Sequence, residues 1–262
     1  MQTPYQYGGP VCNVHDPAFF LRAWQAYTTW CSENAVALEF VRFHPLLRNW
    51  NIYPGEAASN RMAVWVDLAI ADLMTSYQTR VRTAVRKAVK NGLRVEWREG
   101  PESAEWFMEF YYSAMREIAA DQFYFFPQSY FYQLLEWKQA RLAVCMSDIE
   151  PVAAAVFLFG PEVAEYHLSA TSRAGKRLGA TNLLIHEAAQ VAKSRGCRAL
   201  YLGGGTDAQP DNPLLFFKTG FSANRAEFKI AKHVHSKEGY TRLTEEFSKA
   251  YESRPNRILF YR

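Results

Sequence analysis

The stretch that decides the fold is "YHLSATSRAGKRLGATNLLIHEAAQVAKSRGCRALYLGGG", residues 166–205. It begins with the end of a strand, passes through a loop that contains glycine, and continues with apolar positions at helical spacing. A second short apolar strand at 198–204 ends at the first two of three glycines, 203–205. The helix has one apolar face and stops at Gly196; the face is formed by Leu183, Leu184, Ala188, Val191 and Ala192. The stretch therefore predicts a strand–loop–helix–strand crossover.

Three strands in sequence are predicted directly before this helix, at 141–148, 152–160 and 164–171. The turn signals Glu150-Pro151 and Gly160-Pro161 separate them. Two helices, at 101–120 and 127–140, precede the strands. This order combines an antiparallel meander with one crossover, so it is not Rossmann-like. It predicts an α/β (α+β) fold with a mixed sheet and flanking helices.

The N-terminal part of the chain begins with a predicted helix from Asp16-Pro17 to about Asn34, since Asp is a good N-cap and proline fits the first helical turn. Strands follow at 35–43, 61–68 and 93–97. An amphipathic helix before the last of them carries Val81, Val85, Ala88 and Val89 and stops at Asn91-Gly92. We expect two halves, residues 1–100 with 240–262 returning to them, and residues 101–239. Residues 257–262 are expected to be a strand in the first half.

Composition sets broad limits. The 262 residues are 49% hydrophobic and 21% charged, which is typical of a globular protein. A net charge of +4 permits an anionic ligand without requiring nucleic acid, and we expect no DNA partner. The four scattered cysteines are expected to be free thiols in a reducing compartment. No signal peptide and no apolar run of membrane-spanning length is visible, so the sequence predicts a cytoplasmic protein without a membrane span.

Several common motifs are absent. The glycines at 203–205 do not form a P-loop or a dinucleotide fingerprint, and there is no serine nucleophile elbow. The six histidines show no zinc-binding spacing, and His233 and His235 are interpreted as surface side chains of one strand. We therefore expect no metal site, no bound cofactor and no hydrolase chemistry.

The loop before the central helix is the best candidate for a phosphate site. Free N–H groups at a helix start, together with cations and glycine, can hold a phosphate or pyrophosphate. A solvated turn with incidental charges is the alternative. The candidate residues are Arg173, Lys176, Arg177, Leu178, Gly179 and Ala180.

These segments resemble the GNAT superfamily of acyltransferases. They are most similar to its FemAB/FemX-like aminoacyltransferases and to smaller FemAB-related acyltransferases. The resemblance rests on residues 166–205 and on "NPLLFFKTGF" (212–221), with weaker similarity at 5–10, 80–96 and 121–131. It implies two GNAT-like halves, of which the second is better formed. It also implies transfer of an acyl or aminoacyl group from a carrier to an amine, forming an amide.

The resemblance assigns roles to several residues. Phe217 and Lys218 match the Phe-Lys pair of the Fem-type enzymes, whose lysine is thought to stabilise negative charge at the reacting carbonyl; a surface lysine beside core phenylalanines is the alternative. Gly203, Gly204 and Gly205 would let a substrate approach the strand end. Seven of the ten residues at 123–132 are aromatic, and Tyr124 is expected to line an acceptor groove opposite Tyr7, although all of them could be core residues.

The donor is left open between aminoacyl-tRNA, slightly favoured, and acyl-CoA. Acetyl-CoA enzymes of the superfamily usually carry [RQ]-x-x-G-x-[GA], whereas Lys176 and Thr181 stand at the first and last positions here. Arg82, Arg86 and Lys90 share a helical face that could meet RNA phosphates, including a tRNA acceptor end, or remain solvated. The amine acceptor could be a small molecule, a glycan or a peptide. A non-catalytic RNA- or carbohydrate-binding module on the same scaffold is the remaining alternative.

Overall fold

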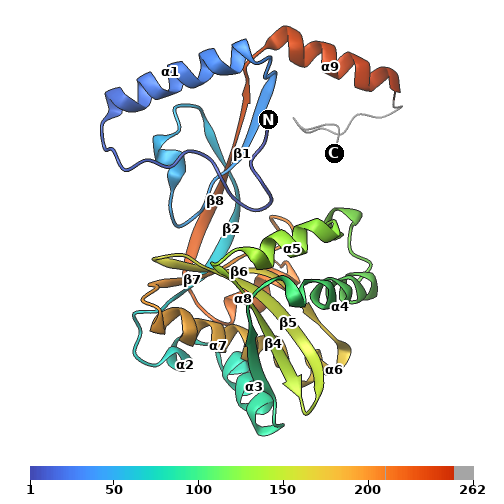
Figure 1. The fold of residues 1–262 in the computed structure, drawn as a ribbon. Coiled ribbons are helices and arrows are strands. Elements are labelled where there is room, and N and C mark those ends of the chain that lie inside the picture. The colour runs from blue at the N-terminus through green and yellow to red at the C-terminus, as the bar shows by residue number, and fades with distance from the viewer. Residues whose placement is uncertain (210, 251–262) are drawn as a thin grey trace. The chain divides into compact units, whose positions relative to one another are not determined.

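The computed structural model describes residues 1–209 and 211–250, which fall into two compact units (Figure 1). Unit 1 contains Met1–Ala63 and the chain from Ala226 onward, and unit 2 is Val64–Arg225. The division therefore lies near residue 63 and not at residue 100, because the helix at 79–90 and the strand at 94–98 pack and pair within unit 2. The strand expected at 257–262 lies outside the described residues.

Unit 1 is built on three strands in the order β1-β8-β2. Its elements are α1 (Pro17–Glu33), β1 (Leu38–Arg42), the 3-10 helix η1 (Asn49–Ile52), β2 (Ala57–Asp67), β8 (Arg225–Val234) and α9 (Lys237–Ala250). β1 and β8 are antiparallel, with Leu38 opposite Val234 and Arg42 opposite Ile230. Helix α1 starts as expected: the Asp16 carboxylate accepts a hydrogen bond from the Ala18 amide at 2.9 Å, and Pro17 occupies the first turn.

Unit 2 carries a mixed sheet in the order β2-β7-β6-β5-β4-β3, in which the end of β2 takes part. Its helices are α2 (Leu73–Ser76), α3 (Thr79–Lys90), α4 (Ala104–Glu117), α5 (Gln128–Glu136), α6 (Arg173–Leu178), α7 (Ala180–Ser194) and α8 (Pro213–Thr219), with the 3-10 turns η2 (Pro101–Ser103) and η3 (Gln122–Tyr124). Its strands are β3 (Arg94–Arg98), β4 (Ala140–Ser147), β5 (Glu150–Phe159), β6 (Val163–Thr171) and β7 (Ala199–Gly204). The predicted meander β4-β5-β6 and the crossover through α7 are confirmed.

Helices cover both faces of this sheet (Figure 1). Ala143 and Cys145 of β4 point into the apolar cluster below α3 and α7, while the alternate residues Leu142 and Val144 are buried on the face that carries α4 and α5. Val89, predicted to belong to the apolar stripe of α3, is 59% exposed, because the buried face of that helix is formed by residues 81, 85 and 88.

The parallel pair β6–β7 is short. Its ladder joins Val163–Glu165 to Ala199–Tyr201. On the other side of β6 the register with β5 shifts between Leu168 and Tyr166, so that residue 167 forms a bulge. Lys218 of α8 reaches the sheet at the end of β7, and Tyr130 of α5 reaches it at the bulge of β6. No helix within residues 1–209 or 211–250 is long and apolar enough to cross a membrane.

Candidate active site

Lys218 is a buried cation at the end of β7. Helix α8, which carries it, begins at Asn212, whose side-chain oxygen accepts the amides of Leu214 and Leu215 at 3.0 and 3.1 Å. Sequence analysis did not predict this short helix, in which Pro213 occupies the permitted first turn. Lys218 is 7% exposed, and its Nζ donates a hydrogen bond to the Gly204 carbonyl oxygen at 2.8 Å.

The glycines of β7 make room for neighbouring side chains. Gly203 has φ +80°, and a Cβ there would lie 3.3 Å from the Lys218 Nζ. A Cβ at Gly205 would lie 2.5 Å from the side-chain oxygen of Asn212. Bulkier residues would therefore displace the ammonium or the cap of α8. Room for these two side chains is a physical reason for the glycines in addition to the predicted approach of a substrate.

Phe217, the residue before Lys218 on α8, is half-buried against the apolar core. Its ring packs edge-on against Phe221, with centroids 5.6 Å apart, and Phe221 in turn contacts Tyr77 at 5.3 Å. Arg80 of α3 binds the same helix through the Phe216 carbonyl oxygen at 2.5 Å and Thr219 at 3.2 Å. These contacts hold α8, and with it the Lys218 ammonium, in one position.

Glu165 is the functional candidate that sequence reasoning missed. It lies on β6 opposite Tyr201, and no described residue makes a hydrogen bond to its buried Oε1 oxygen. Burial raises the pKa of Glu165 to about 8, while Lys218 acts in the opposite direction. Burial lowers the pKa of Lys218 to about 7, while Glu165 acts to raise it. The available signal was an isolated acid within the strand "VAEYHLSAT".

His167, at the bulge of β6, meets the aromatic segment. Its Nε2 lies 2.6 Å from the hydroxyl of Tyr130 on α5, and Tyr130 stacks on Phe126 at 4.6 Å. Burial lowers the pKa of His167 to about 4, so the ring is neutral at physiological pH. The segment 123–132 therefore reaches β6 through Tyr130, a residue that sequence analysis did not single out.

The two tyrosines expected in the acceptor groove occupy different units. Tyr124 is half-buried in η3, with its ring 5.5 Å from that of Phe123. Tyr7 packs edge-on against His44 at 5.2 Å and Phe228 at 5.5 Å in unit 1. Their role as walls of one groove stays a prediction.

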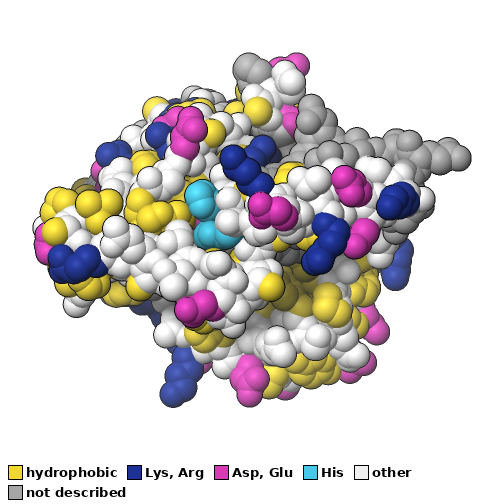
Figure 2. Space-filling model, turned by 90° about the horizontal axis from the view of Figure 1, so that it is seen from above, with side chains coloured by type: hydrophobic (Ala, Val, Ile, Leu, Met, Phe, Trp, Pro, Cys, Tyr) yellow, Lys and Arg dark blue, Asp and Glu magenta, His cyan; other side chains and the backbone are white. Residues whose placement is uncertain are grey.

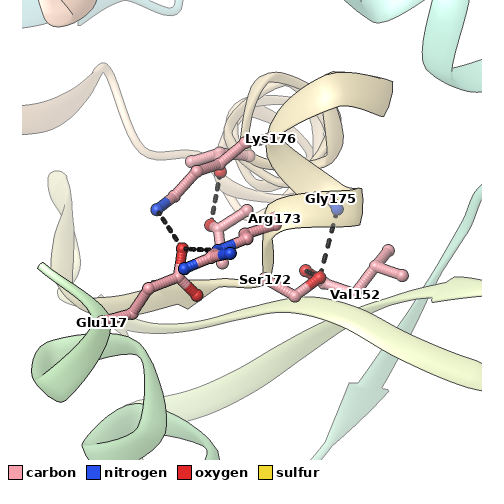
Figure 3. A network of polar contacts seen from close by, with 8 residues as sticks. Glu117, Val152, Ser172, Arg173, Gly175 and Lys176 are labelled. Atoms are coloured by element: carbon pink, nitrogen blue, oxygen red, sulfur yellow. Dashed lines mark hydrogen bonds and ion pairs between the residues drawn. The ribbon is translucent and has the colours of Figure 1, made fainter.

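The expected phosphate loop is a short helix, α6, and not a loop. Ser172 accepts the Gly175 amide at 3.1 Å and so begins the helix, while Arg173 and Lys176 form ion pairs with Glu117 at 3.1 and 3.5 Å (Figure 3). The Arg173 guanidinium lowers the pKa of Glu117. A Cβ at Gly175 would lie 2.2 Å from the Val152 carbonyl oxygen, so glycine lets α6 pack directly on β5.

The longer helix α7 begins immediately after α6. Gly179 joins the two with φ +78°, and a Cβ there would lie 2.7 Å from the Ala84 carbonyl oxygen of α3. Among the described residues no side chain caps the start of α7. Ala180 is buried and Leu178 packs on the core, so these two can offer a donor only their backbone groups. Arg177 is exposed.

The cations of α3 do not act as one set. Arg82 donates hydrogen bonds to the Tyr77 carbonyl oxygen and, at 2.9 Å, to the Thr79 hydroxyl, so it stabilises the start of its own helix. Arg86 and Lys90 are exposed. Metal chemistry has no visible site either, since the described part of the chain contains no group of three His, Cys, Asp or Glu side chains placed to hold an ion.

Known proteins give the fold and this site a context. The family described as Acetyltransferase (GNAT) domain matches residues 75–211, just over half of the chain. The chain therefore belongs to this family of GNAT acyltransferases, as the resemblance implied. No curated protein matches the sequence.

Solved structures share the fold over most of its length. FemX aligns with a TM-score of 0.66 at 15% identity, covering 84% of this chain and 78% of that one. L-PGS from Bacillus licheniformis aligns with a TM-score of 0.62 at 14% identity, covering 90% and 78%. The C-terminal domain of a protein assigned as a lysylphosphatidylglycerol synthetase, from Agrobacterium fabrum, gives 0.61 at 17% identity, covering 87% and 77%. At such identities the likeness establishes the fold alone.

Proposed function

We propose that the protein is an N-acyltransferase that moves an aminoacyl group from an ester on a carrier to an acceptor amine. The observation that carries this proposal is the buried Glu165–Lys218 pair beside the end of β7, with the Lys218 Nζ on the Gly204 carbonyl oxygen at 2.8 Å. Buried ionisable groups with opposite shifts in pKa are typical of catalytic sites. The GNAT fold accounts for direct transfer without a protein nucleophile.

The two side chains would have separate tasks. The amine nitrogen attacks the carbonyl carbon of the ester, and a C–N bond forms while the carbonyl oxygen becomes negative. The Lys218 ammonium stabilises that oxygen, and the Glu165 carboxylate accepts the proton that the nitrogen loses. When the C–O bond to the carrier breaks, the carrier oxygen takes up a proton and leaves as a hydroxyl. The products are an amide and the free carrier.

Aminoacyl-tRNA is the donor we favour. The segment Lys176–Thr181 lacks the residues usual for acetyl-CoA at its first and last positions. Arg177 and the first amides of α7 could still meet a phosphate of the carrier end. The resemblance of residues 166–205 and 212–221 to FemAB/FemX-like aminoacyltransferases is our reason for preferring an aminoacyl donor, and the fold shared with FemX is compatible with it. The acceptor would be an amine on a small molecule, a glycan or a peptide, with Tyr124 and Tyr7 among its contacts.

Intact-mass spectrometry of the products tests the activity. Purified protein is incubated with aminoacyl-tRNA or with acyl-CoA and a panel of amines of these three kinds. We expect an added aminoacyl mass on one amine with the tRNA donor, and no gain with the Lys218→Ala variant. Transfer from acyl-CoA alone would assign the other donor. An absence of product with both donors, while amines still bind, would support a non-catalytic binding module.

A further inference from the structure

The outer sides of α3 and α6 together form a basic surface. It comprises Arg86, Lys87, Lys90, Lys176 and Arg177, all exposed, and we call it the α3–α6 basic surface. Arg86 and Lys90 are four residues apart and so lie on one side of α3. Lys87 joins this side to α6, since its Nζ donates a hydrogen bond to the Arg177 carbonyl oxygen at 2.9 Å. The cations of two helices thus form one continuous surface.

Few acidic side chains neutralise the cations of this surface. Within residues 1–209 and 211–250, no acidic side chain lies within ion-pair distance of Arg86, Lys87, Lys90 or Arg177, and Lys176 shares Glu117 with Arg173. Helix α3 contains no acid at all. By contrast, the face of the molecule in Figure 2 intersperses basic and acidic side chains. Lys87 and Lys90 lie in the last turn of α3, where the helix dipole favours cations, so the helix tolerates this concentration of charge without an acidic partner.

The surface is also rigid. Gly179 brings the start of α7 against the backbone of α3, where a Cβ would lie only 2.7 Å from the Ala84 carbonyl oxygen. Val81, Val85 and Ala88 fix the opposite side of α3 in the core. The helix backbones thus hold the attachment points of the cations at fixed spacings, which suits a stiff polyanion whose phosphates are regularly spaced.

We infer that the α3–α6 basic surface binds the phosphate backbone of a double-helical RNA, as in the stem of a tRNA donor. The inference rests on the proposed function and names the part of the donor that this surface would hold. A-form RNA is recognised largely through its phosphates and shape, which matches a set of cations without base-reading groups. A membrane-binding helix adds several large apolar side chains to its cations, and among the described residues of α3 and α6 Val89 is the only large apolar side chain so strongly exposed.

Fluorescence anisotropy with the whole chain tests the surface. The probes are uncharged bulk tRNA and a labelled 12-base-pair RNA hairpin, titrated at several salt concentrations. The triple variant Arg86→Ala, Lys90→Ala, Arg177→Ala should bind both at least about 10-fold more weakly at 0.1 M salt. The slope of log Kd against log salt should fall by about 2 to 3, since each lost phosphate contact removes about 0.7 to 0.9.

A matched variant controls for net charge. Arg22→Ala, Lys138→Ala, Arg242→Ala removes the same three charges from exposed sites elsewhere and should bind like the unchanged protein. Equal weakening by both variants would overturn the inference, as would binding to vesicles with 30% anionic lipid and none to RNA. Lys218→Ala should retain RNA binding, so a failure of catalysis and a failure of this surface give different results.

Discussion

Each unit of the molecule buries a glutamate oxygen, and the two glutamates, Glu39 and Glu165, differ in their hydrogen-bond donors. In unit 1 the Glu39 carboxylate accepts hydrogen bonds from the Tyr27 hydroxyl at 2.5 Å and the Tyr53 hydroxyl at 2.7 Å, with the His235 Nε2 at 3.8 Å. In unit 2 no described residue makes a hydrogen bond to the Oε1 of Glu165. Lys218, its electrostatic partner, donates instead to the Gly204 carbonyl oxygen.

This difference in hydrogen bonding is the one expected between a carboxylate with a structural role, Glu39, and a proposed catalytic base, Glu165. Two hydroxyl donors compensate Glu39 for lost water, and burial beside it raises the pKa of both tyrosines, so they remain donors at physiological pH. A buried acceptor without a donor costs about 1 to 3 kcal/mol. Glu165 bears that cost at the position of the proposed base, and this is the pattern expected when reactivity is retained at the expense of stability.

The largest effect is expected from removing the ammonium. Lys218→Ala should lower kcat by about 100-fold or more, because one oxyanion partner is lost, with little change in the KM for the donor. Lys218→Met keeps the volume of the side chain, and Lys138→Ala is the exposed control. Steady-state kinetics measures kcat and KM for each variant, and a thermal melt shows whether each variant is folded. Normal turnover by a folded Lys218→Met protein would remove Lys218 from the mechanism.

Replacing the acid should have a somewhat smaller effect with a distinct pH signature. Glu165, with a pKa of about 8, and Lys218, with a pKa of about 7, coexist as carboxylate and ammonium only in a minor fraction of the molecules, and that fraction is largest between these two values. The profile of kcat/KM should therefore be bell-shaped, with a maximum between these values.

In Glu165→Gln the acidic limb should disappear and the maximum rate should fall by about 10- to 100-fold, at the low end of general-base effects because water can accept the proton. The melting temperature should change little, since the buried oxygen without a donor is replaced while Lys218 loses the carboxylate that raises its pKa. Glu150→Gln, an exposed change, should behave like the unchanged protein. An unaltered profile in Glu165→Gln would exclude the proposed base.

The opposite result is expected in unit 1. Tyr53→Phe leaves a Glu39 oxygen without its donor and should lower the free energy of unfolding by about 1 to 3 kcal/mol while leaving turnover unchanged. Denaturant titration measures the change, and Tyr132→Phe, at an exposed position, is the control. If Tyr53→Phe lost turnover without losing stability, the contrast between the two glutamates would be reversed.

The smallest effect concerns His235. Burial is the main cause of its lowered pKa; Glu39 opposes the shift, and His233 and the N-terminal ammonium add to it. A lowered pKa in the folded state means that the unfolded chain binds the proton better, so stability should decline as pH falls below about 6.5. His235→Gln should flatten that slope by less than about 1 kcal/mol between pH 7 and pH 5. If the free energy of unfolding of His235→Gln depended on pH as steeply as that of the unchanged protein, other groups would be responsible for the decline in stability.

Sequence patterns predicted much of the scaffold, but burial of polar residues much less well. The cap at Asp16, the meander and the stop of α3 at Asn91-Gly92 follow from local rules and are present. His235 was wrongly interpreted as a surface residue: its side chain is 3% exposed, because Trp24 and Tyr27 of α1 cover it. That contact joins distant parts of the chain, which periodicity cannot detect.

Only part of the candidate site could be predicted, because its other residues also depend on contacts between distant parts of the chain. The pair Phe217-Lys218 could be found by resemblance, and in the structure Lys218 is buried and Phe217 half-buried. Glu165 could not be ranked above other acids, because its isolation depends on which elements cover β6. Arg82 and Arg86 are four residues apart on the same side of α3, but the Arg82 side chain donates hydrogen bonds to Tyr77 and Thr79 at the start of the helix. The spacing of residues does not determine which way such a side chain turns.

The bulge at His167 changes the parity of β6. Before it, the even-numbered Ala164 and Tyr166 face the cluster under α7; after it, the odd-numbered Ser169 and Thr171 do, as their hydroxyl contacts with Tyr166 at 2.5 Å and Thr181 at 2.6 Å show. One extra residue thus shifts the phase of the strand between Glu165 and the start of α7. If the same sequence paired regularly with β5, without the bulge, Ser169 and Thr171 would move to the opposite face of the sheet. Both hydroxyl contacts therefore depend on one residue that stands outside the ladder.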